Sequence, residues 1–161
     1  MENWRPIQDF QNYSVSDEGR VLNVSTGRIM MLSENQRFLV IVGLMRNGMQ
    51  YKRAVSHLVA DAFLSPPKFE TFDSIINLDG DRRNNFATNL MWRPRWFALK
   101  HQRQFFSRTG TGVPVFDQDT GEEYATAWEA AIVNGLLVRD VVESAMQGKE
   151  VWPTRQRFVS S

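Results

Sequence analysis

Cysteine is absent from this chain of 161 residues, and histidine occurs only at His57 and His101. Without cysteine the protein cannot contain a disulfide scaffold, a thiolate zinc site or a cysteine nucleophile. Two histidines are too few for a metal site built from several imidazole ligands.

Long apolar runs are also missing. No stretch approaches the length of a membrane span, and the N-terminus, Met1-Glu2-Asn3-Trp4-Arg5, lacks the apolar segment of a secretion signal. We therefore expect a soluble, intracellular protein without a membrane partner. Hydrophobic residues still make up 42% of the chain and aromatic residues 12%, which is enough for a packed core. A chain of this length forms one ordinary domain or a few small modules.

Basic residues are concentrated in one part of the chain. The net charge is only +1, yet every charged side chain between Arg82 and Phe116 is basic. A block of one sign produces a local field that attracts phosphate. The structural alternative is a solvated face balanced by distant acids. The basic residues of the block are Arg82, Arg83, Arg93, Arg95, Lys100, Arg103 and Arg108.

The first third of the sequence predicts a β-rich module. Period-two alternation at residues 13–15, followed by a turn at Asp17-Glu18-Gly19, indicates two short strands. Asn47-Gly48 lies between the apolar run 38–44 and residues 49–52, which is a strong hairpin signal. From Arg53 the apolar residues recur at spacings of three and four, so a helix is expected until Ser65-Pro66-Pro67.

The central stretch, residues 75–92, predicts strand, loop and strand, with a helix over residues 94–106. An apolar run ends in the acidic turn Asp79-Gly80-Asp81, and a loop with Asn84 and Asn85 follows. The two aspartates are candidate metal ligands, or they cap backbone amides of the turn. Asparagine side chains in such a loop commonly bond to nearby backbone and hold irregular turns.

The last third predicts a small α+β module behind a flexible joint at Gly110-Thr111-Gly112. Two short strands are expected within residues 113–124. Thr126 and Glu129 have the spacing of a capping box, and helices are expected on both sides of Asn134-Gly135. Such a pair suits a helix-turn-helix whose DNA contacts would come from Arg139, Lys149, Arg155 and Arg157. A structural or protein-binding helical pair is the alternative.

Several segments form one pattern when they are taken in chain order. At the N-terminus these are Trp4-Arg5-Pro6-Ile7, Asn12-Tyr13, Val15-Ser16 and Gly19-Arg20-Val21, followed by the helix His57-Leu58-Val59-Ala60-Asp61-Ala62-Phe63. Together they resemble the nuclease-associated module of the phage and intron HNH homing endonuclease family. Leu78-Asp79-Gly80-Asp81, Asn84-Asn85, Asn89-Leu90 and Trp92 are similar to its nuclease core, and His101 matches a late histidine of its helix. The C-terminal Gly121 and Glu129-Ala130-Ala131 resemble a repeat appended to intron-encoded nucleases.

The departures from the family pattern fall on its chemistry. The resemblance implies metal-assisted phosphodiester hydrolysis, with HNH-equivalent catalytic positions at Asn77, Asn89 and His101. Asn77 stands where the family has its general-base histidine, and an amide cannot accept a proton near neutral pH. Ile76 and Ala98 stand where metal ligands are expected, and neither offers the oxygen donor that Mg²⁺ requires. We therefore expect no metal and no cleavage. The alternative is a shifted site that binds Mg²⁺ or another divalent metal through Asp79, Asp81 and His101.

These observations predict an α+β protein in three parts. A β-rich module over 1–52 precedes an HNH-like ββα-metal core over 53–108, and a ββαα helix-turn-helix module occupies 109–161. The expected function is binding of double-stranded DNA by a phage-encoded pseudoenzyme, redeployed for regulation or within a larger assembly. An active Mg²⁺-dependent nicking endonuclease and a protein–protein interaction module are the alternatives. The expected location is the cytoplasm of a phage host or the virion. The expected nucleic-acid contacts are Arg82, Arg83, Arg93, Arg95, Lys100 and Arg103.

Overall fold

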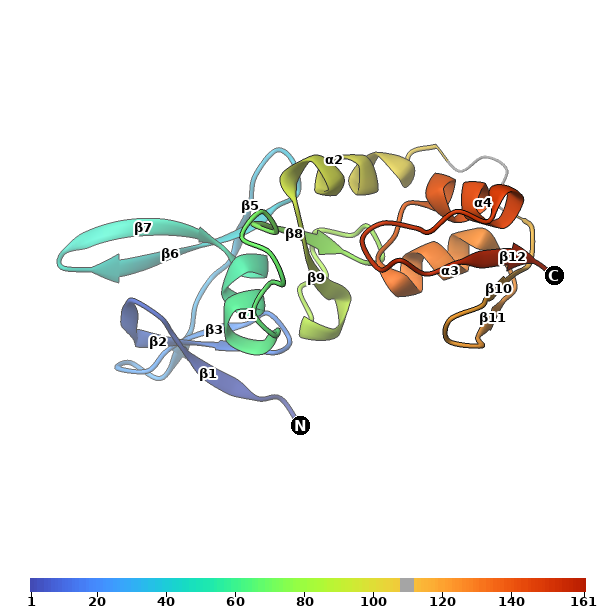
Figure 1. The fold of residues 1–161 in the computed structure, drawn as a ribbon. Coiled ribbons are helices and arrows are strands. Elements are labelled where there is room, and N and C mark those ends of the chain that lie inside the picture. Colours follow the sequence, from blue (N-terminus) through green and yellow to red (C-terminus); the bar gives the residue numbers. More distant parts are fainter. Residues whose placement is uncertain (108–111) are drawn as a thin grey trace. The chain divides into compact units, whose positions relative to one another are not determined.

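The computed structural model describes residues 1–107 and 112–161. The chain forms two compact units, Met1–Arg95 and Trp96–Ser161, whose elements are labelled in Figure 1. Each unit has its own hydrophobic core. Most of the joint expected at Gly110-Thr111-Gly112, together with Arg108, lies outside the described residues. The division of the chain at 52 and 108 remains a prediction.

Two small antiparallel sheets form the N-terminal part of the first unit. One contains β1 (Trp4–Ile7), β2 (Phe10–Ser16), β3 (Val21–Asn23) and β4 (Arg28–Ile29) in that order, and the other contains β5 (Ser33–Glu34), β6 (Val40–Arg46) and β7 (Met49–Ala54). The β6–β7 hairpin extends away from the remainder of its unit (Figure 1). Its turn residues Asn47 and Gly48 have φ angles of 52° and 76°, as a two-residue turn of this kind requires. The hairpin expected from Asn-Gly is therefore confirmed.

Helix α1 (Val55–Phe63) covers the core of the first unit. Val55, Leu58 and Val59 point into a cluster that also includes alternate residues of β6 and β2. The structure starts the helix two residues later than the sequence pattern suggested, because β7 continues through Arg53 and Ala54. The helix ends before the two prolines, as expected, with the Leu64 N–H donating to the carbonyl of Ala60 at 3.0 Å.

A two-stranded ribbon completes the first unit. Strand β8 (Ser74–Asn77) pairs with β9 (Leu90–Arg93), and a single 3₁₀ turn, η1 (Ala87–Asn89), leads into the second strand. The register places Asn77 opposite Leu90 and Ile76 opposite Met91. Trp92 is half-buried and makes an edge-to-face contact with His57 of α1 at 6.1 Å between ring centroids. The strand–loop–strand arrangement expected over residues 75–92 is therefore present.

The second unit consists of a three-stranded sheet and three helices. Helix α2 (Arg95–Gln104), whose first residue closes the first unit, is followed by β10 (Val115–Asp117), β11 (Glu123–Tyr124), α3 (Ala127–Asn134), α4 (Val138–Gln147) and β12 (Phe158–Ser160). The sheet order is β11-β10-β12. The third strand, β12, was not expected from the sequence, which predicted ββαα. The core contains Val115, Ala130, Leu136, Val141 and Phe158, all fully buried.

Local sequence signals define the ends of α3 and α4. The Thr126 hydroxyl accepts from the Glu129 N–H at 3.0 Å, and the Glu129 carboxylate accepts from the Ala125 N–H at 2.9 Å. This is the expected capping box, except that the Glu129 carboxylate binds the N–H of the residue before the N-cap instead of the N-cap N–H itself. Gly135 and Gly148 end the two helices in the left-handed conformation. The assignment of this pair as a DNA-binding helix-turn-helix stays a prediction.

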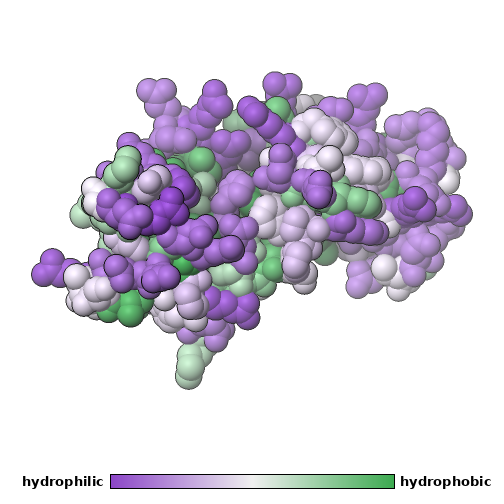
Figure 2. All heavy atoms as spheres, turned by 60° about the vertical axis from the view of Figure 1, so that its left-hand side comes forward, coloured by the Kyte–Doolittle hydropathy of each residue, from purple (hydrophilic) through white to green (hydrophobic). Residues whose placement is uncertain are grey.

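The small sheets and four helices among the described residues confirm the α+β class. On the face drawn in Figure 2, hydrophilic residues predominate and hydrophobic residues lie in small, separate areas. Across residues 1–107 and 112–161, every helix is too short or too polar to span a bilayer.

Candidate catalytic and nucleic-acid-binding site

The end of β8 holds Ile76 and Asn77, the two positions that the sequence resemblance predicts for a metal ligand and for the general base. Ile76 is 2% exposed and belongs to the hydrophobic interior, while Asn77, at 7%, is the last residue of the strand. The Asn77 side-chain amide donates to the carbonyl of Asn84 at 2.8 Å and to the Asn85 side-chain oxygen at 3.3 Å. The Asn77 side chain therefore stabilises the loop that follows it through these two hydrogen bonds.

The acidic turn after β8 is held by its own carboxylates. Oδ1 of Asp79 accepts from the Asp81 N–H at 2.9 Å, and Oδ1 of Asp81 accepts from the Arg83 N–H at 2.9 Å. Asp79 also accepts from the side-chain amides of Asn84 at 2.7 Å and Asn89 at 2.9 Å. Both aspartates thus cap amides, which is one of the two roles that the sequence predicted for them.

Asn89 closes the same loop from the other side. Its side-chain oxygen accepts from the Asp79 N–H at 3.1 Å, and its amide donates to the Asn84 carbonyl at 2.9 Å as well as to Asp79. The loop from Leu78 to Asn89 is therefore a network of asparagine and aspartate bonds. The role expected of the asparagines as loop scaffolding is visible in these contacts.

The residues present do not fit a catalytic divalent metal. Hard cations require several oxygen ligands converging on one point, and the Asp79 oxygens already converge on three nitrogen donors of the loop. The buried side chain of Ile76 contributes only hydrocarbon. Within the described part of either unit, no three side chains of His, Cys, Asp or Glu come together as candidate ligands. The donor set of this turn therefore supports no metal-dependent step.

Arg82 and Arg83 attach the loop to the β5–β6 connection. The Arg83 guanidinium forms an ion pair with Glu34 at 3.0 Å and lies over the Phe38 ring at 4.7 Å. Arg82 donates to the Arg37 carbonyl at 3.3 Å. The Glu34 partner raises the pKa of Arg83 above its ordinary value. The Arg83 side chain remains half exposed, so it can meet phosphate while it holds this contact.

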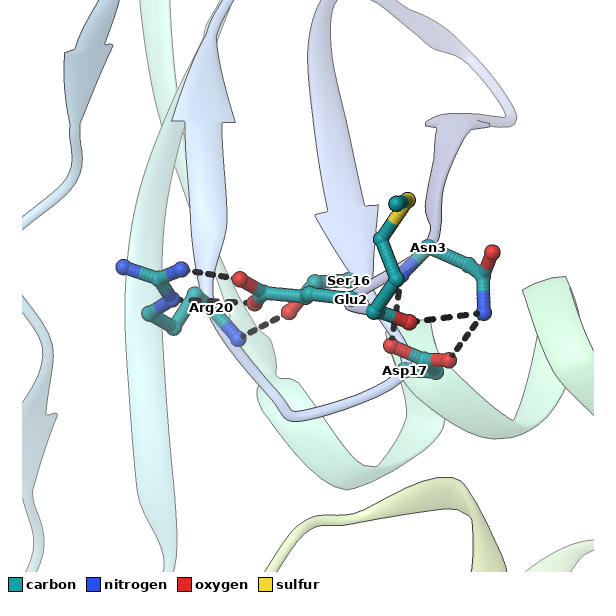
Figure 3. Close-up of polar contacts among 6 residues, drawn as sticks. Glu2, Asn3, Ser16, Asp17 and Arg20 are labelled. Carbon is teal, nitrogen blue, oxygen red and sulfur yellow. Dashed lines mark hydrogen bonds and ion pairs between the residues drawn. The ribbon is translucent and has the colours of Figure 1, made fainter.

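The turn between β2 and β3 braces the loop from the N-terminal sheet. Asn3 donates to the Asp17 carboxylate from both its backbone and its side chain, at 2.9 and 2.7 Å, and Glu2 pairs with Arg20 (Figure 3). The hydrogen bonds from Arg20 and Ser16 lower the pKa of Glu2 to about 2. The carbonyl of Asp17 then accepts from the Ala87 N–H at 2.8 Å.

Gly19 allows this turn to approach the asparagine network closely. Its φ is +84°, and a Cβ added to it would lie 3.0 Å from the Cβ of Asn85. Asn85 in turn accepts from Asn77. The sequence predicted the turn at Asp17-Glu18-Gly19, but no local signal could have shown that it meets a loop more than sixty residues away.

The predicted basic contacts divide into exposed and buried residues. Arg95, Lys100 and Arg103 are exposed on α2, where they can meet an anion. Arg93 is only 6% exposed, and burial lowers the pKa of its guanidinium to about 10. Such burial is typical of an arginine with a structural role. It does not support the phosphate contact that the sequence predicted for Arg93.

His101 belongs to the interior of the second unit. It is 1% exposed and lies between the rings of Phe97 and Phe105, at centroid distances of 6.4 and 5.2 Å. A general base must reach the group whose proton it takes, and this packing is typical of a core residue. The role of His101 in a shifted metal site with Asp79 and Asp81 stays a prediction.

Two of the four C-terminal cations form ion pairs with acids of their own module. Lys149 pairs with Glu143 at 2.9 Å, and Arg157 pairs with Glu150 at 2.9 Å. Arg155 has φ of +62° in the turn after Val151, and Arg139 is exposed on the first turn of α4. Of the four cations considered for DNA contact, Arg139 is the one whose position on a helix best suits it.

Comparison with known proteins agrees with the resemblance in the sequence. Residues 2–43 match the NUMOD4 motif. The chain is 29% identical over 89 residues to an uncharacterized HNH endonuclease, L245, of Acanthamoeba polyphaga mimivirus, covering 55% of this chain and 26% of that protein. It is 28% identical over 151 residues to a second, L247, of the same virus, covering 89% of this chain and 38% of that protein. The chain thus spans well under half the length of the curated relatives it matches.

A solved structure extends the similarity to the whole fold. The HNH homing endonuclease I-HmuI, described in a study of its DNA binding and cleavage, superposes with a TM-score of 0.58 at 20% identity. The match covers 99% of this chain and 98% of that one. The resemblance to HNH homing endonucleases is therefore confirmed. This chain is similar in sequence to HNH endonucleases, matches the NUMOD4 motif over residues 2–43 and has the fold of an HNH homing endonuclease.

Proposed function

We propose that this chain binds double-stranded DNA through an HNH-type fold and does not cleave it. The proposal that the chain does not cleave DNA rests on Asn77. By the sequence resemblance it stands where HNH nucleases have their general base, its amide hydrogens are directed at Asn84 and Asn85, and an amide does not take a proton from water at neutral pH. Loss of a general base costs on the order of 10²–10⁴ in rate.

DNA binding is supported by what the catalytic substitutions leave intact. The relatives are named as HNH endonucleases, and the solved neighbour is described as binding DNA. The basic residues Arg82, Arg83, Arg95, Lys100 and Arg103 follow Asn77 in the sequence. Contacts from such side chains to phosphate supply affinity without requiring catalysis. The proposal includes a phage origin and a role in regulation or assembly.

A matched pair of variants tests binding at the loop. Arg83→Gln and Glu34→Gln both break the same ion pair, but only the first removes a cation. We expect Arg83→Gln to weaken binding of a labelled duplex at low salt and to reduce the slope of log affinity against log salt by about one. Glu34→Gln is expected to keep the full slope, because Arg83 stays charged.

The two failures of this experiment have different meanings. If wild-type protein shows no affinity for duplex DNA even at low salt, the proposal is wrong and the protein-interaction alternative is favoured. If both variants reduce affinity and slope equally, the Arg83–Glu34 pair matters for the shape of the loop, and Arg83 is not itself a phosphate contact.

A further inference from the structure

Helices α2 and α4 enclose a groove within the second unit. Its volume is about 890 Å³, far more than one phosphate ion fills, and it is open to solvent. One wall comes from the C-terminal half of α2 and the other from the start of α4. The described residues that line it are Lys100, Arg103, Gln104, Ser107, Leu137, Val138, Arg139, Asp140, Val142 and Glu143.

Three cations from two distant parts of the sequence meet in this groove. Lys100 and Arg103 come from α2, and Arg139 comes from α4. Two acids, Asp140 and Glu143, line it as well, so the lining carries three positive and two negative charges, a net of +1. Glu143 is neutralised by its ion pair with Lys149 at 2.9 Å. The groove as a whole is therefore positive.

Asp140 is the acidic residue of the groove that interacts with Lys100 and Arg139. Burial raises the pKa of its carboxyl, Glu143 raises it further, and Lys100 and Arg139 act in the opposite direction. Positive charge from both walls thus reaches the same carboxylate. An anion placed between Lys100 and Arg139 would be attracted by the same two side chains.

Gln104 fixes the two walls to one another. Its side-chain oxygen accepts from the Val138 N–H at 3.0 Å, and its side-chain nitrogen donates to the Leu136 carbonyl at 3.3 Å. Leu137, the N-cap of α4, provides no side-chain cap of its own. The amide of Gln104 thus supplies from α2 the cap that the local sequence lacks.

An aromatic contact joins the end of α2 to α3 in the same unit. The ring of Phe105, just after α2, meets Trp128 of α3 edge to face at 5.1 Å between centroids. The two Gln104 bonds join α2 to the start of α4, and this contact holds the end of α2 against α3, so the helices that carry the cations are held together before any ligand binds. A preorganised charged groove binds with less loss of conformational entropy than separate mobile side chains.

We propose that this groove binds the phosphodiester backbone of DNA, with Lys100, Arg103 and Arg139 as contacts and Gln104 as the positioning residue. The inference rests on the proposed function and names one site for it. Charge complementarity selects the ligand, because the groove carries net positive charge and its guanidinium and ammonium groups are suited to phosphate oxygens.

The contacts are tested by salt dependence with a labelled duplex of random sequence. Removing a phosphate contact lowers the slope of log affinity against log salt by about one. We expect Lys100→Ala, Arg103→Ala and Arg139→Ala each to do so, and the triple variant to lower it by about three. Lys68→Ala, which removes an exposed cation of the first unit, is the control and is expected to keep the wild-type slope.

The positioning role is tested by a substitution that changes no charge. Gln104→Ala is expected to lower the slope by about as much as Arg139→Ala, because Arg139 is no longer held over the groove. Adding Arg139→Ala to Gln104→Ala is then expected to lower it no further. A residue with a merely structural role would leave the slope unchanged, and thermal unfolding of each variant verifies that it is folded.

The outcomes separate this inference from the proposed function. If wild-type protein binds the duplex and the triple variant keeps its slope, the groove is not a DNA site, although DNA binding stands. If Gln104→Ala leaves the slope intact while Arg139→Ala lowers it, the positioning role is wrong. If wild-type protein does not bind duplex DNA, the proposed function itself fails.

Discussion

Replacing Asp79 by alanine tests whether the acidic turn is a scaffold or the remnant of a metal site. Asp79 accepts three hydrogen bonds, from the Asp81 N–H at 2.9 Å, Asn84 at 2.7 Å and Asn89 at 2.9 Å. Hydrogen bonds to a charged group contribute roughly 1.5–3 kcal/mol each. Because Asp79 is exposed and water replaces part of what is lost, we expect a loss of about 2–4 kcal/mol in the free energy of unfolding.

The measurement is urea denaturation with and without millimolar Mg²⁺. Asp81→Ala is the matched control, since Asp81 accepts the Arg83 N–H and its loss is expected to cost about 1 kcal/mol. A ligand that binds only the folded state stabilises it by RT ln(1 + L/Kd), where L is the free ligand concentration. We expect Mg²⁺ to change the stability of wild-type protein and of Asp79→Ala by the same small amount. The scaffold role is refuted if Mg²⁺ stabilises wild-type protein and this gain disappears in Asp79→Ala.

Three further changes have defined outcomes. Gly19→Ala is expected to lower the free energy of unfolding by about 2–3 kcal/mol in urea denaturation, because of left-handed strain and the close contact with Asn85. An unchanged free energy of unfolding would show that the turn does not pack tightly against Asn85. Thr126→Ala, which removes the N-cap oxygen bonded to the Glu129 N–H, is expected to cost about 1 kcal/mol, and no loss of thermal stability would contradict the capping role. Burial raises the pKa of Asp140, so protonation on acidification begins above the usual aspartate range and removes a negative charge from the groove. DNA affinity at fixed salt is therefore expected to rise more steeply on acidification in wild-type protein than in Asp140→Asn. An equal rise in the two proteins would contradict the effect of Asp140 on DNA binding.

Short-range signals allowed much of the fold to be predicted. Asn47-Gly48 predicted the hairpin because its φ angles need residues that tolerate the left-handed region. Thr126 and Glu129 predicted the start of α3 because the capping bonds span only a few residues. The strand β12 was missed because residues 158–160 are too few to show a pattern and form a strand only by pairing with β10.

The site was harder to predict because its decisive contacts join distant residues. Arg83 was expected to face phosphate, yet its partner Glu34 lies 49 positions earlier in the chain. The cap of α4 comes from Gln104, 34 positions before Val138. The burial of Arg93 and His101 likewise depends on tertiary packing, which residue type alone does not reveal.

We propose above that the protein has an HNH-type fold but lacks the side chains that cleavage requires. A plasmid-nicking assay measures cleavage directly. Supercoiled plasmid is incubated with the purified protein in Mg²⁺ and, separately, in Mn²⁺. Open-circular product is then compared with a protein-free sample and with the His101→Ala variant. We predict that wild-type protein produces no more nicked plasmid than the protein-free sample in either metal. Nicking by wild-type protein that is lost in His101→Ala would contradict this and favour an active endonuclease with a shifted site.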